Sequence, residues 1–180
     1  MNQVIVLGLG NFGQQYQFSR HNVGFMLLDK ILPEVGEWKT RTNPAYKVVT
    51  LQLDKLELQL VKPATFMNQS GLVAQKIRKH NPQLALENWY VVHDDLDIEL
   101  GQYKIQMGRG PKVHNGLLSI YSQLQTNDFW HVRVGVDGRA GKRVLSGSDY
   151  VLQPFPPGEK IILNGVLDKA KSELLNRWKS

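Results

Sequence analysis

The sequence predicts an α/β fold, a single domain over residues 1–180 in which a mixed, twisted β-sheet is flanked by helices on both sides. Short apolar runs bounded by turn residues alternate with segments of helical periodicity, as in α/β proteins. One pair of alternating segments reads as a β-hairpin, which makes the sheet mixed rather than purely parallel. The length of 180 residues suits one sizeable core, and no repeat or clear linker divides the chain.

The N-terminal part of the chain predicts a strand followed by a helix. Residues 3–7 (QVIVL) form an apolar run that ends at glycine, which indicates a short buried strand. Helical periodicity begins only after His21 and predicts a helix over residues 22–32, which the next residue, a proline, would terminate. The face of this helix that we expect to be apolar contains Phe25, Leu28 and Leu32.

The next two predicted strands form the hairpin. Residues 46–53 and 56–62 alternate between apolar and polar on either side of an Asp-Lys turn. The polar segment KPATFMNQSG follows them. A second helix is predicted over residues 72–79, where an Asn-Pro pair ends it.

The second half of the chain predicts three more strands, two helices and one long loop. The strands are expected at residues 89–93, 103–107 and 131–136, and the helices between the loop GRGPKVHNG and Leu124 and over residues 159–178. Residues 138–158 are rich in Gly, Ser and Pro and predict an irregular loop. The last helix should bury a stripe of Leu163, Val166, Leu167, Ala170, Leu174 and Trp178.

The charge distribution favours a polyanionic partner. The chain has a net charge of +6, and between residues 103 and 147 seven Lys or Arg residues stand against two Asp residues. A basic stretch of this kind suits the phosphates of a nucleic acid, and a solvated basic surface is the alternative explanation.

The composition excludes several classes of protein. Hydrophobic residues make up 42% and charged residues 21%, which are ordinary values for a folded soluble protein. No apolar run is long enough to cross a bilayer and no secretory signal is evident, so we expect a cytoplasmic protein without membrane contact. The absence of cysteine excludes disulfides, thiolate zinc sites and cysteine nucleophiles.

A G-x-G-x-x-G motif follows the first strand, in VIVLGLGNFG, but its surroundings do not fit a dinucleotide site. In such a site the helix opens at the glycine loop, so that its first amides meet the pyrophosphate. The residues after Gly13 (QQYQFSR) show no helical stripe, and no acidic residue ends a second strand at the usual distance. We expect the glycines to let the backbone turn sharply at the end of the strand.

Polar side chains recur where strands end or helices begin. Asn11 lies in the first turn and His21 just before the first helix, and Asn68, Asp94 and Asn115 lie in similar places. Each alone has an ordinary explanation as a turn former, a helix cap or a partly exposed histidine. Because such ends gather at one edge of an α/β sheet, the five together describe a hydrolytic site: a base, a carboxylate to orient it, and amide donors for an oxyanion.

Other chemistries fit the residues less well. Ser19 and Ser70 lie in no G-x-S-x-G turn, which argues against a serine nucleophile. The histidines form no H-x-x-x-H or H-E-x-x-H pair, and the aspartates after His93 form no calcium loop. We therefore expect neither a metal nor a cofactor.

At this point the sequence resembles a known family. It is similar to the bacterial-type peptidyl-tRNA hydrolases over essentially its whole length, with five motifs in the same order: GLGNFGQQYQFSRHNVGF, KPATFMNQSG, HDDLDIELGQYKIQMG, VHNGLLSI and HVRVGV. The resemblance implies a monomeric, metal-independent α/β enzyme. Its substrate would be peptidyl-tRNA, whose ester between the peptide and the 3′ end of tRNA is cleaved to recycle tRNA from stalled translation.

The resemblance also implies roles for residues that match the motifs. His21 would be the general base that takes a proton from the attacking water, and Asp94 would orient its imidazole and stabilise the imidazolium. Asn11 and Asn68 would bind near the scissile carbonyl, with Asn68 the better donor to the oxyanion. Asn115 would position the peptide backbone.

Four further residues are expected to bind the substrate by the same resemblance. Tyr16 and Met67 would help to line the cleft. Lys104 and Arg133 would hold phosphates of the tRNA acceptor end, contacts that set affinity without reading sequence.

The chain departs from the family pattern in two places. Gln106 stands where a second basic residue is common, so that one phosphate contact is missing. The loop GRGPKVHNG, usually glycine-rich, here carries Arg109 and Lys112. We predict that these two cations replace the lost one in binding the acceptor stem.

Two other functions compete with the hydrolase. One is an RNA-binding relative that keeps the cleft without turnover, although a pure binder has no need for an oriented base. The other is a dinucleotide oxidoreductase, which would carry bound nicotinamide or flavin.

Overall fold

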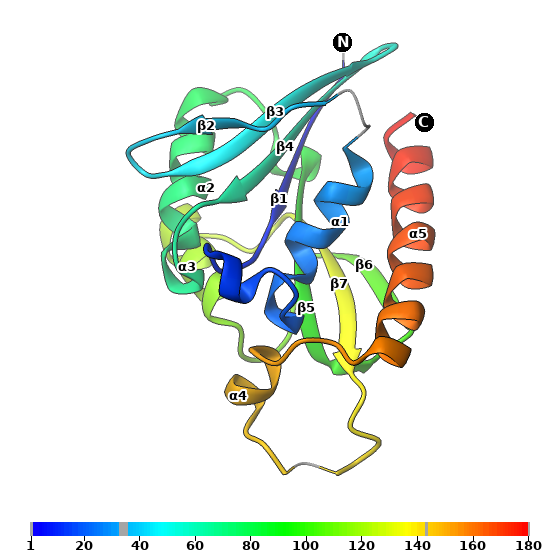
Figure 1. The fold of residues 1–180 in the computed structure, drawn as a ribbon. Coiled ribbons are helices and arrows are strands. Elements are labelled where there is room, and N and C mark those ends of the chain that lie inside the picture. The colour runs from blue at the N-terminus through cyan, green and yellow to red at the C-terminus, as the bar shows by residue number, and fades with distance from the viewer. Residues whose placement is uncertain (1, 33–35, 143, 180) are drawn as a thin grey trace.

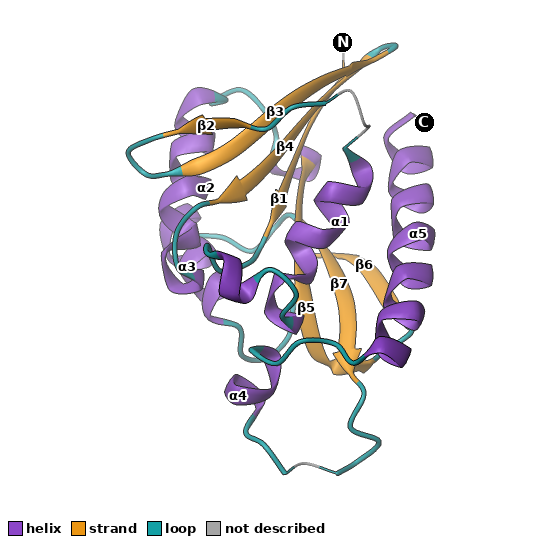
Figure 2. Cartoon of the chain, viewed as in Figure 1, coloured by secondary structure: helices purple, strands orange, loops and turns teal. Residues whose placement is uncertain are grey.

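The computed structural model describes residues 2–32, 36–142 and 144–179, which form one seven-stranded sheet with helices on both faces (Figures 1 and 2). The strands are β1 (Asn2–Gly8), β2 (Lys39–Arg41), β3 (Tyr46–Leu53), β4 (Leu56–Pro63), β5 (Trp89–Glu99), β6 (Tyr103–Met107) and β7 (Trp130–Asp137). Their order across the sheet is β2-β3-β4-β1-β5-β7-β6. β1 pairs in parallel with β4 and β5, and β5 with β7, while the remaining pairs are antiparallel. The predicted mixed sheet is therefore confirmed.

The helices cover the two faces of the sheet in pairs. They are α1 (Val23–Ile31), α2 (Ser70–His80), α3 (Asn115–Leu124), α4 (Gly147–Val151) and α5 (Pro157–Lys179). Figure 1 shows α1 and α5 on one face and α2 and α3 on the other. The short α4 lies below the ends of β5 and β7 in that view. Among the described helices none is long and apolar enough to cross a membrane.

Alternate side chains of β1 contribute to two hydrophobic cores, one on each face of the sheet. Val4 and Val6 face the core under α1 and α5, whereas Ile5 and Leu7 face the core under α2 and α3. Successive side chains of a strand point to opposite faces, so an entirely apolar strand is what a sheet covered on both sides requires. All six residues of the predicted stripe on α5 are buried, namely Leu163, Val166, Leu167, Ala170, Leu174 and Trp178.

Two glycines bring α1 into close contact with the sheet. A Cβ atom on Gly24 would lie 2.5 Å from the carbonyl oxygens of Leu9 and Val92, and one on Gly8 would lie 2.7 Å from the carbonyl oxygen of Gly24. The glycine motif thus serves packing, and α1 starts only at Val23 rather than at the glycine turn. A 3₁₀ turn at Gln14–Tyr16 occupies the place where a dinucleotide fold would start its helix.

The structure corrects several boundaries. The buried face of α1 consists of Val23, Gly24, Leu27, Leu28 and Ile31, and the predicted Phe25 and Leu32 are only half-buried. β5 continues to Glu99, well past the predicted end at residue 93, because its polar residues stay paired with β7. Residues 138–158 are not wholly irregular, since α4 lies within them and α5 begins at Pro157. The short edge strand β2 was not predicted.

Candidate active site

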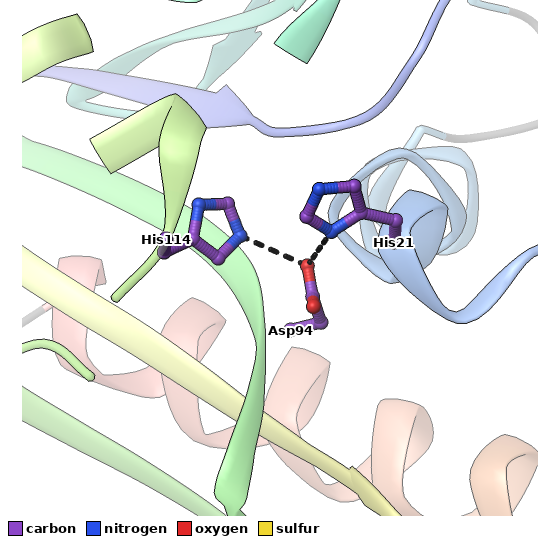
Figure 3. Close-up of side chains that lie close together, drawn as sticks. All are labelled: His21, Asp94 and His114. Carbon is purple, nitrogen blue, oxygen red and sulfur yellow. Dashed lines mark hydrogen bonds and ion pairs between the residues drawn. The ribbon is translucent and has the colours of Figure 1, made fainter. Parts of the chain in front are cut away.

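Two histidines converge on one buried carboxylate in β5, just beyond the level at which the neighbouring parallel strand β1 ends (Figure 3). The Nδ1 atom of His21 lies 2.8 Å from Oδ1 of Asp94, and the Nε2 atom of His114 lies 2.9 Å from the same oxygen. His21 comes from the turn before α1, Asp94 from β5, and His114 from the residue before α3. The predicted pairing of His21 with Asp94 is confirmed. No role was predicted for His114, which lies in the motif VHNGLLSI.

The hydrogen bonds define the protonation of His114. Its Nδ1 accepts a hydrogen bond from the backbone N–H of Leu117, at 3.3 Å, and caps the N-terminus of α3. The proton of the neutral ring is therefore on Nε2, which donates to Asp94. His114 is 6% exposed, so this contact is shielded from water.

The same reasoning applies to His21. An ionised Asp94 can only accept, so Nδ1 of His21 carries the proton that it donates. The second ring nitrogen, Nε2, then has a free lone pair, and in Figure 3 it points away from Asp94. His21 lines a cavity of about 700 Å³. This arrangement leaves Nε2 as a basic nitrogen that is not engaged by Asp94, on a residue that lines the cavity.

Asp94 is ionised under neutral conditions despite its burial. Burial raises the pKa of its carboxyl, but His21 and His114, through charge and hydrogen bonds, outweigh burial and leave the pKa lowered from its ordinary value of 3.8. The side chain is 3% exposed. A buried carboxylate that accepts two histidine N–H groups is suited to orient them and to stabilise positive charge on either ring.

The amide side chains predicted from the sequence gather around the same cavity. Asn11, Asn68 and Asn115 all line it, together with Met67. Oδ1 of Asn11 accepts the backbone N–H of Met67 at 2.9 Å, and the Asn22 side chain bonds both the backbone N–H and the carbonyl of Asn11. The orientation of Asn11 is thereby set, with its NH₂ group left as the donor that can face a substrate.

Asn68 and Asn115 are held less firmly. Both are exposed, at the 3₁₀ turn Met67–Gln69 and at the first residue of α3. Met67 itself is 5% exposed, and its sulfur lies 2.5 Å from where a Cβ of Gly116 would be. The glycine of the His-Asn-Gly sequence therefore admits the methionine against α3.

Tyr16 does not take the position expected from the sequence. It ends the 3₁₀ turn Gln14–Tyr16, is half-buried, and is absent from the described residues that line the cavity. The cavity instead has an outer wall that the sequence did not predict, formed on α4 and the residue after it by Gly147, Ser148, Val151 and Leu152.

A buried arginine, also not predicted, attaches this outer wall to the turn that carries His21. Arg20 is 3% exposed, and its Nη1 lies 2.6 Å from a carboxylate oxygen of Glu159. Its guanidinium also lies over the rings of Tyr150 and Phe155, at 4.3 and 4.6 Å from their centroids. Cation–π contacts and an ion pair thus join the turn before α1 to the segment around α4.

The predicted cations lie on the β6–β7 side of the cavity. Lys104, Arg109 and Lys112 are exposed, and Lys112 lines the cavity. Lys104 and Arg133 are opposite each other in the β6–β7 register. The exposed lysines and Arg109 are therefore placed to meet an anion that approaches from this side.

Arg133 differs from the other cations because it is already paired. It is 8% exposed, its Nε donates to Asp95 at 2.7 Å, and its Nη1 donates to Oε1 of Gln106 at 2.8 Å. Gln106, which replaces the expected cation, thus accepts a hydrogen bond from Arg133. The charge of Arg133 is largely balanced by buried Asp95, which leaves the exposed cations as the stronger anion ligands.

His21, Asp94 and His114 are also the one group, within residues 2–32, 36–142 and 144–179, whose ligand atoms lie close enough to hold a metal ion. Their donor set argues for hydrogen bonding instead. Metal binding through Nε2 of His114 requires the proton on Nδ1, where it would oppose the N–H of Leu117. A metal ion at this position would therefore break the hydrogen bond from Leu117 to His114 that caps α3.

A second pair of histidines lies buried behind Asp94. The backbone carbonyl of Asp94 accepts from Nδ1 of His93 at 2.9 Å, and Nδ1 of His131 lies 3.3 Å from Nε2 of His93. In the neutral pair, Nδ1 of His93 donates to the carbonyl of Asp94, and Nε2 of His93 accepts from Nδ1 of His131. A proton added to Nε2 of His93 would therefore face the N–H group of His131. Burial lowers the pKa of His93 well below 6.5 and that of His131 to about 4.

These buried histidines predict a loss of stability in mild acid. Their folded pKa values lie below the unfolded value, so the unfolded chain binds more protons as the pH falls below about 6.5. Between pH 6.5 and 5, a range in which ordinary carboxylates stay ionised, the free energy of unfolding should fall by about 1.5 kcal/mol through His131, and His93 should lower it further. Urea unfolding at several pH values measures how steeply the free energy of unfolding depends on pH. His131→Asn should make this dependence less steep, whereas His80→Ala, at an exposed histidine, should leave it unchanged. The same dependence in the parent protein and in both variants would contradict the role of the buried histidines.

Comparison with known proteins identifies the family of the chain. The family model described as peptidyl-tRNA hydrolase matches residues 5–179. A peptidyl-tRNA hydrolase of Campylobacter jejuni subsp. doylei is 41% identical over 172 residues, which cover 96% of this chain and 89% of that protein. One from Mycolicibacterium gilvum is 38% identical over 168 residues, covering 93% and 86%.

A solved structure extends the likeness to the fold. The peptidyl-tRNA hydrolase of Acinetobacter baumannii superposes with a TM-score of 0.85 at 28% identity, over 95% of this chain and 86% of that one. The family model and these relatives lead to one conclusion. The chain belongs to the peptidyl-tRNA hydrolase family.

Proposed function

We propose that this hydrolase cleaves the ester of peptidyl-tRNA with His21 as the general base. The observation that carries the proposal is the pair of hydrogen bonds from His21 and His114 to Asp94 at the wall of the cavity. Nε2 of His21 would take a proton from water while the water oxygen attacks the ester carbonyl carbon. The imidazolium that forms would be stabilised by Asp94 and would return the proton to the 3′ oxygen of tRNA as the ester breaks.

The amides would bind the oxygen that becomes negative in the tetrahedral intermediate. Asn68 is exposed to the cavity and is the preferred donor, and the NH₂ group of Asn11 is the second. Asn115 would hold the peptide backbone, with Met67 as an apolar wall beneath it. His114 would act on Asp94 rather than on the substrate and is therefore a positioning residue.

The tRNA would approach over β6, β7 and the loop before α3. Lys104, Arg109 and Lys112 would bind phosphates of the acceptor end, while Arg133, paired with Asp95, would shape this surface. Phosphate contacts of this kind set affinity and orientation and make binding sensitive to salt. We further propose that residues 1–180 act as one domain, as a monomer in the cytoplasm, where peptidyl-tRNA is made.

The defining experiment follows release of a labelled peptide from peptidyl-tRNA. We expect free peptide and intact deacylated tRNA as products, with the same rate in the presence of a chelator, because water is activated by His21 and not by a metal. Binding of the substrate without release would support the RNA-binding alternative. Loss of activity on chelation with recovery on adding a metal would overturn the mechanism.

The two loop cations provide a separate test of the tRNA surface. Replacing Arg109 and Lys112 together by alanine should raise KM for peptidyl-tRNA about tenfold and leave kcat nearly unchanged, since the contacts lie away from the ester. If both cations bind phosphates, the slope of log KM against log salt concentration should also be smaller in the double variant than in the parent, by about 1.5–2.

The matched control removes the same charge from surfaces away from the cavity. Lys55 lies in the β3–β4 turn and Lys79 near the end of α2, and both are exposed. The Lys55→Ala, Lys79→Ala protein should keep the parent KM and salt slope. Equal effects in the two double variants would mean that only net charge matters and that the loop does not bind the acceptor stem.

A further inference from the structure

A second cavity adjoins the active site on the other side of Asn11. Its volume is about 490 Å³, and Asn11 lines both cavities. The second cavity lies between the turn after β1, the helix α1 and the ends of β3 and β4. None of the roles assigned above uses it.

The floor of this cavity is built around a buried lysine. Lys62 is 8% exposed and forms an ion pair with Asp29. Its ammonium lies 4.6 Å from the ring centroid of Trp38 and 5.5 Å from that of Phe25, and the indole N–H of Trp38 donates to Asp29 at 3.2 Å. Segments distant in the sequence are thereby joined into one rigid wall with aromatic faces.

The charge of the cavity is positive. Lys47 lies opposite Lys62 in the β3–β4 register, is exposed, and lines the cavity. Among the described lining residues Lys47 and Lys62 stand against the single acid Asp29. Burial is the main cause that lowers the pKa of Lys62, and Lys47 adds to this effect. A ligand that brings negative charge near Lys47 would therefore be favoured.

The order of the sheet says which part of the substrate can reach this cavity. Asn11 follows β1 and Asp94 lies on β5, so the ester would be held near these central strands. The cations proposed for tRNA lie on the β7–β6 side, and the second cavity lies on the β4–β3 side. The ester joins the peptide to the tRNA, so these two parts of the substrate extend from it in different directions. If the tRNA extends toward β6, the peptide can extend toward β3.

We propose that the second cavity binds the peptide arm of the substrate and prefers an acidic side chain there. This proposal rests on the function proposed above. The residues next to the ester-linked one would lie over Trp38 and Phe25, the amides of Gln14 and Gln17 at the rim would bond the peptide backbone, and Lys47 would meet a carboxylate. Each extended residue spans about 3.3–3.6 Å, so substrates with one to four residues probe the reach of the cavity.

The experiment compares substrates that share one tRNA and one ester-linked residue. N-acetyl-aminoacyl-tRNA has no peptide arm to place in the cavity, whereas tri- and tetrapeptidyl-tRNAs do. Acidic, neutral and lysine residues are placed in turn at the second and third positions from the ester. We expect an acidic residue at one of these positions to lower KM about threefold relative to lysine, the size typical of an exposed charge pair.

Charge reversal at the rim gives the decisive variant. Lys47→Glu should invert the preference, so that lysine-containing peptides have the lower KM, while Lys55→Glu, at the far turn of the same hairpin, should preserve it. Both positions are exposed, so folding should not be affected. Trp38→Ala should raise KM for the longer peptides and change kcat/KM for N-acetyl-aminoacyl-tRNA much less.

The outcomes separate this proposal from the proposed function. Hydrolysis of all substrates with no dependence on peptide charge, or an unchanged preference in Lys47→Glu, would overturn the peptide cavity and leave the hydrolase mechanism intact. An equal change for short and long substrates would assign the cavity to tRNA instead, which also overturns it. Absence of hydrolysis with every substrate would count against the proposed function itself.

Discussion

Replacing His21 by alanine should lower kcat for peptidyl-tRNA by about 10²–10⁴-fold while leaving KM nearly unchanged. The range is what a positioned general base contributes. His21 offers its Nε2 lone pair to the cavity because Nδ1 is committed to Asp94, and no other described histidine lines that cavity except His114. His114 cannot replace His21 as the base, because both of its ring nitrogens are engaged: Nε2 donates to Asp94, and Nδ1 accepts from the N–H of Leu117.

Single-turnover hydrolysis with saturating enzyme measures this step without product release. The matched control is His80→Ala, because His80 is exposed at the end of α2 and its ring bonds the backbone carbonyl of Lys76 within the same helix. Binding of tRNA should be the same in both variants, and thermal unfolding should show that both are fully folded at the assay temperature. A His21→Ala enzyme that keeps kcat within threefold of the parent would remove His21 from the mechanism.

Asp94→Asn should reduce kcat by about 10⁴-fold, an effect of the size seen for the corresponding change in a serine protease triad. The amide oxygen can still accept both N–H groups at the Oδ1 position, but it carries no charge to stabilise an imidazolium at His21. Unlike the carboxylate, the amide can also turn its NH₂ group toward His21 and donate to an unprotonated Nδ1. The form of His21 that is protonated on Nε2 should then become populated, and this form has no lone pair on Nε2 to accept a proton from water.

The ¹⁵N chemical shifts of the His21 ring report its tautomer and provide a readout that simple loss of packing would not change. The control is Asp128→Asn, at an exposed carboxyl in the loop before β7. Full activity of Asp94→Asn, with the His21 ring still protonated at Nδ1, would mean that the carboxylate neither orients nor stabilises the base.

Much of the fold could be predicted because its signals are local. The apolar run at residues 3–7, the hairpin around Asp54 and Lys55 and the stripe on α5 each follow from side-chain periodicity, and the structure confirms all three. The face of α1 was predicted less well. Its close approach to the sheet at Gly24 turns Leu27 and Ile31 inward and leaves Phe25 at the second cavity.

The pairing of His21 with Asp94 could also be anticipated, but the surroundings of this pair could not. His21 and Asp94 were expected together because ends of parallel strands meet at one sheet edge. Nothing local distinguishes His114 from a helix cap, and it is in fact both a cap and a partner of Asp94. The pairing of Arg133 with Asp95 and Gln106 joins three strands, and such a contact has no sequence period.

Local signals in the sequence were enough to predict the α/β class, the order of most strands and helices along the chain, the basic stretch and the pairing of His21 with Asp94. The packed structure was needed to establish the ring tautomers, the balanced charge of Arg133, the place of Tyr16 outside the cavity and the second cavity around Lys62. Periodicity and turn chemistry act over a few neighbouring residues, whereas hydrogen-bond direction, desolvation and cavities depend on which distant segments the packed sheet brings into contact.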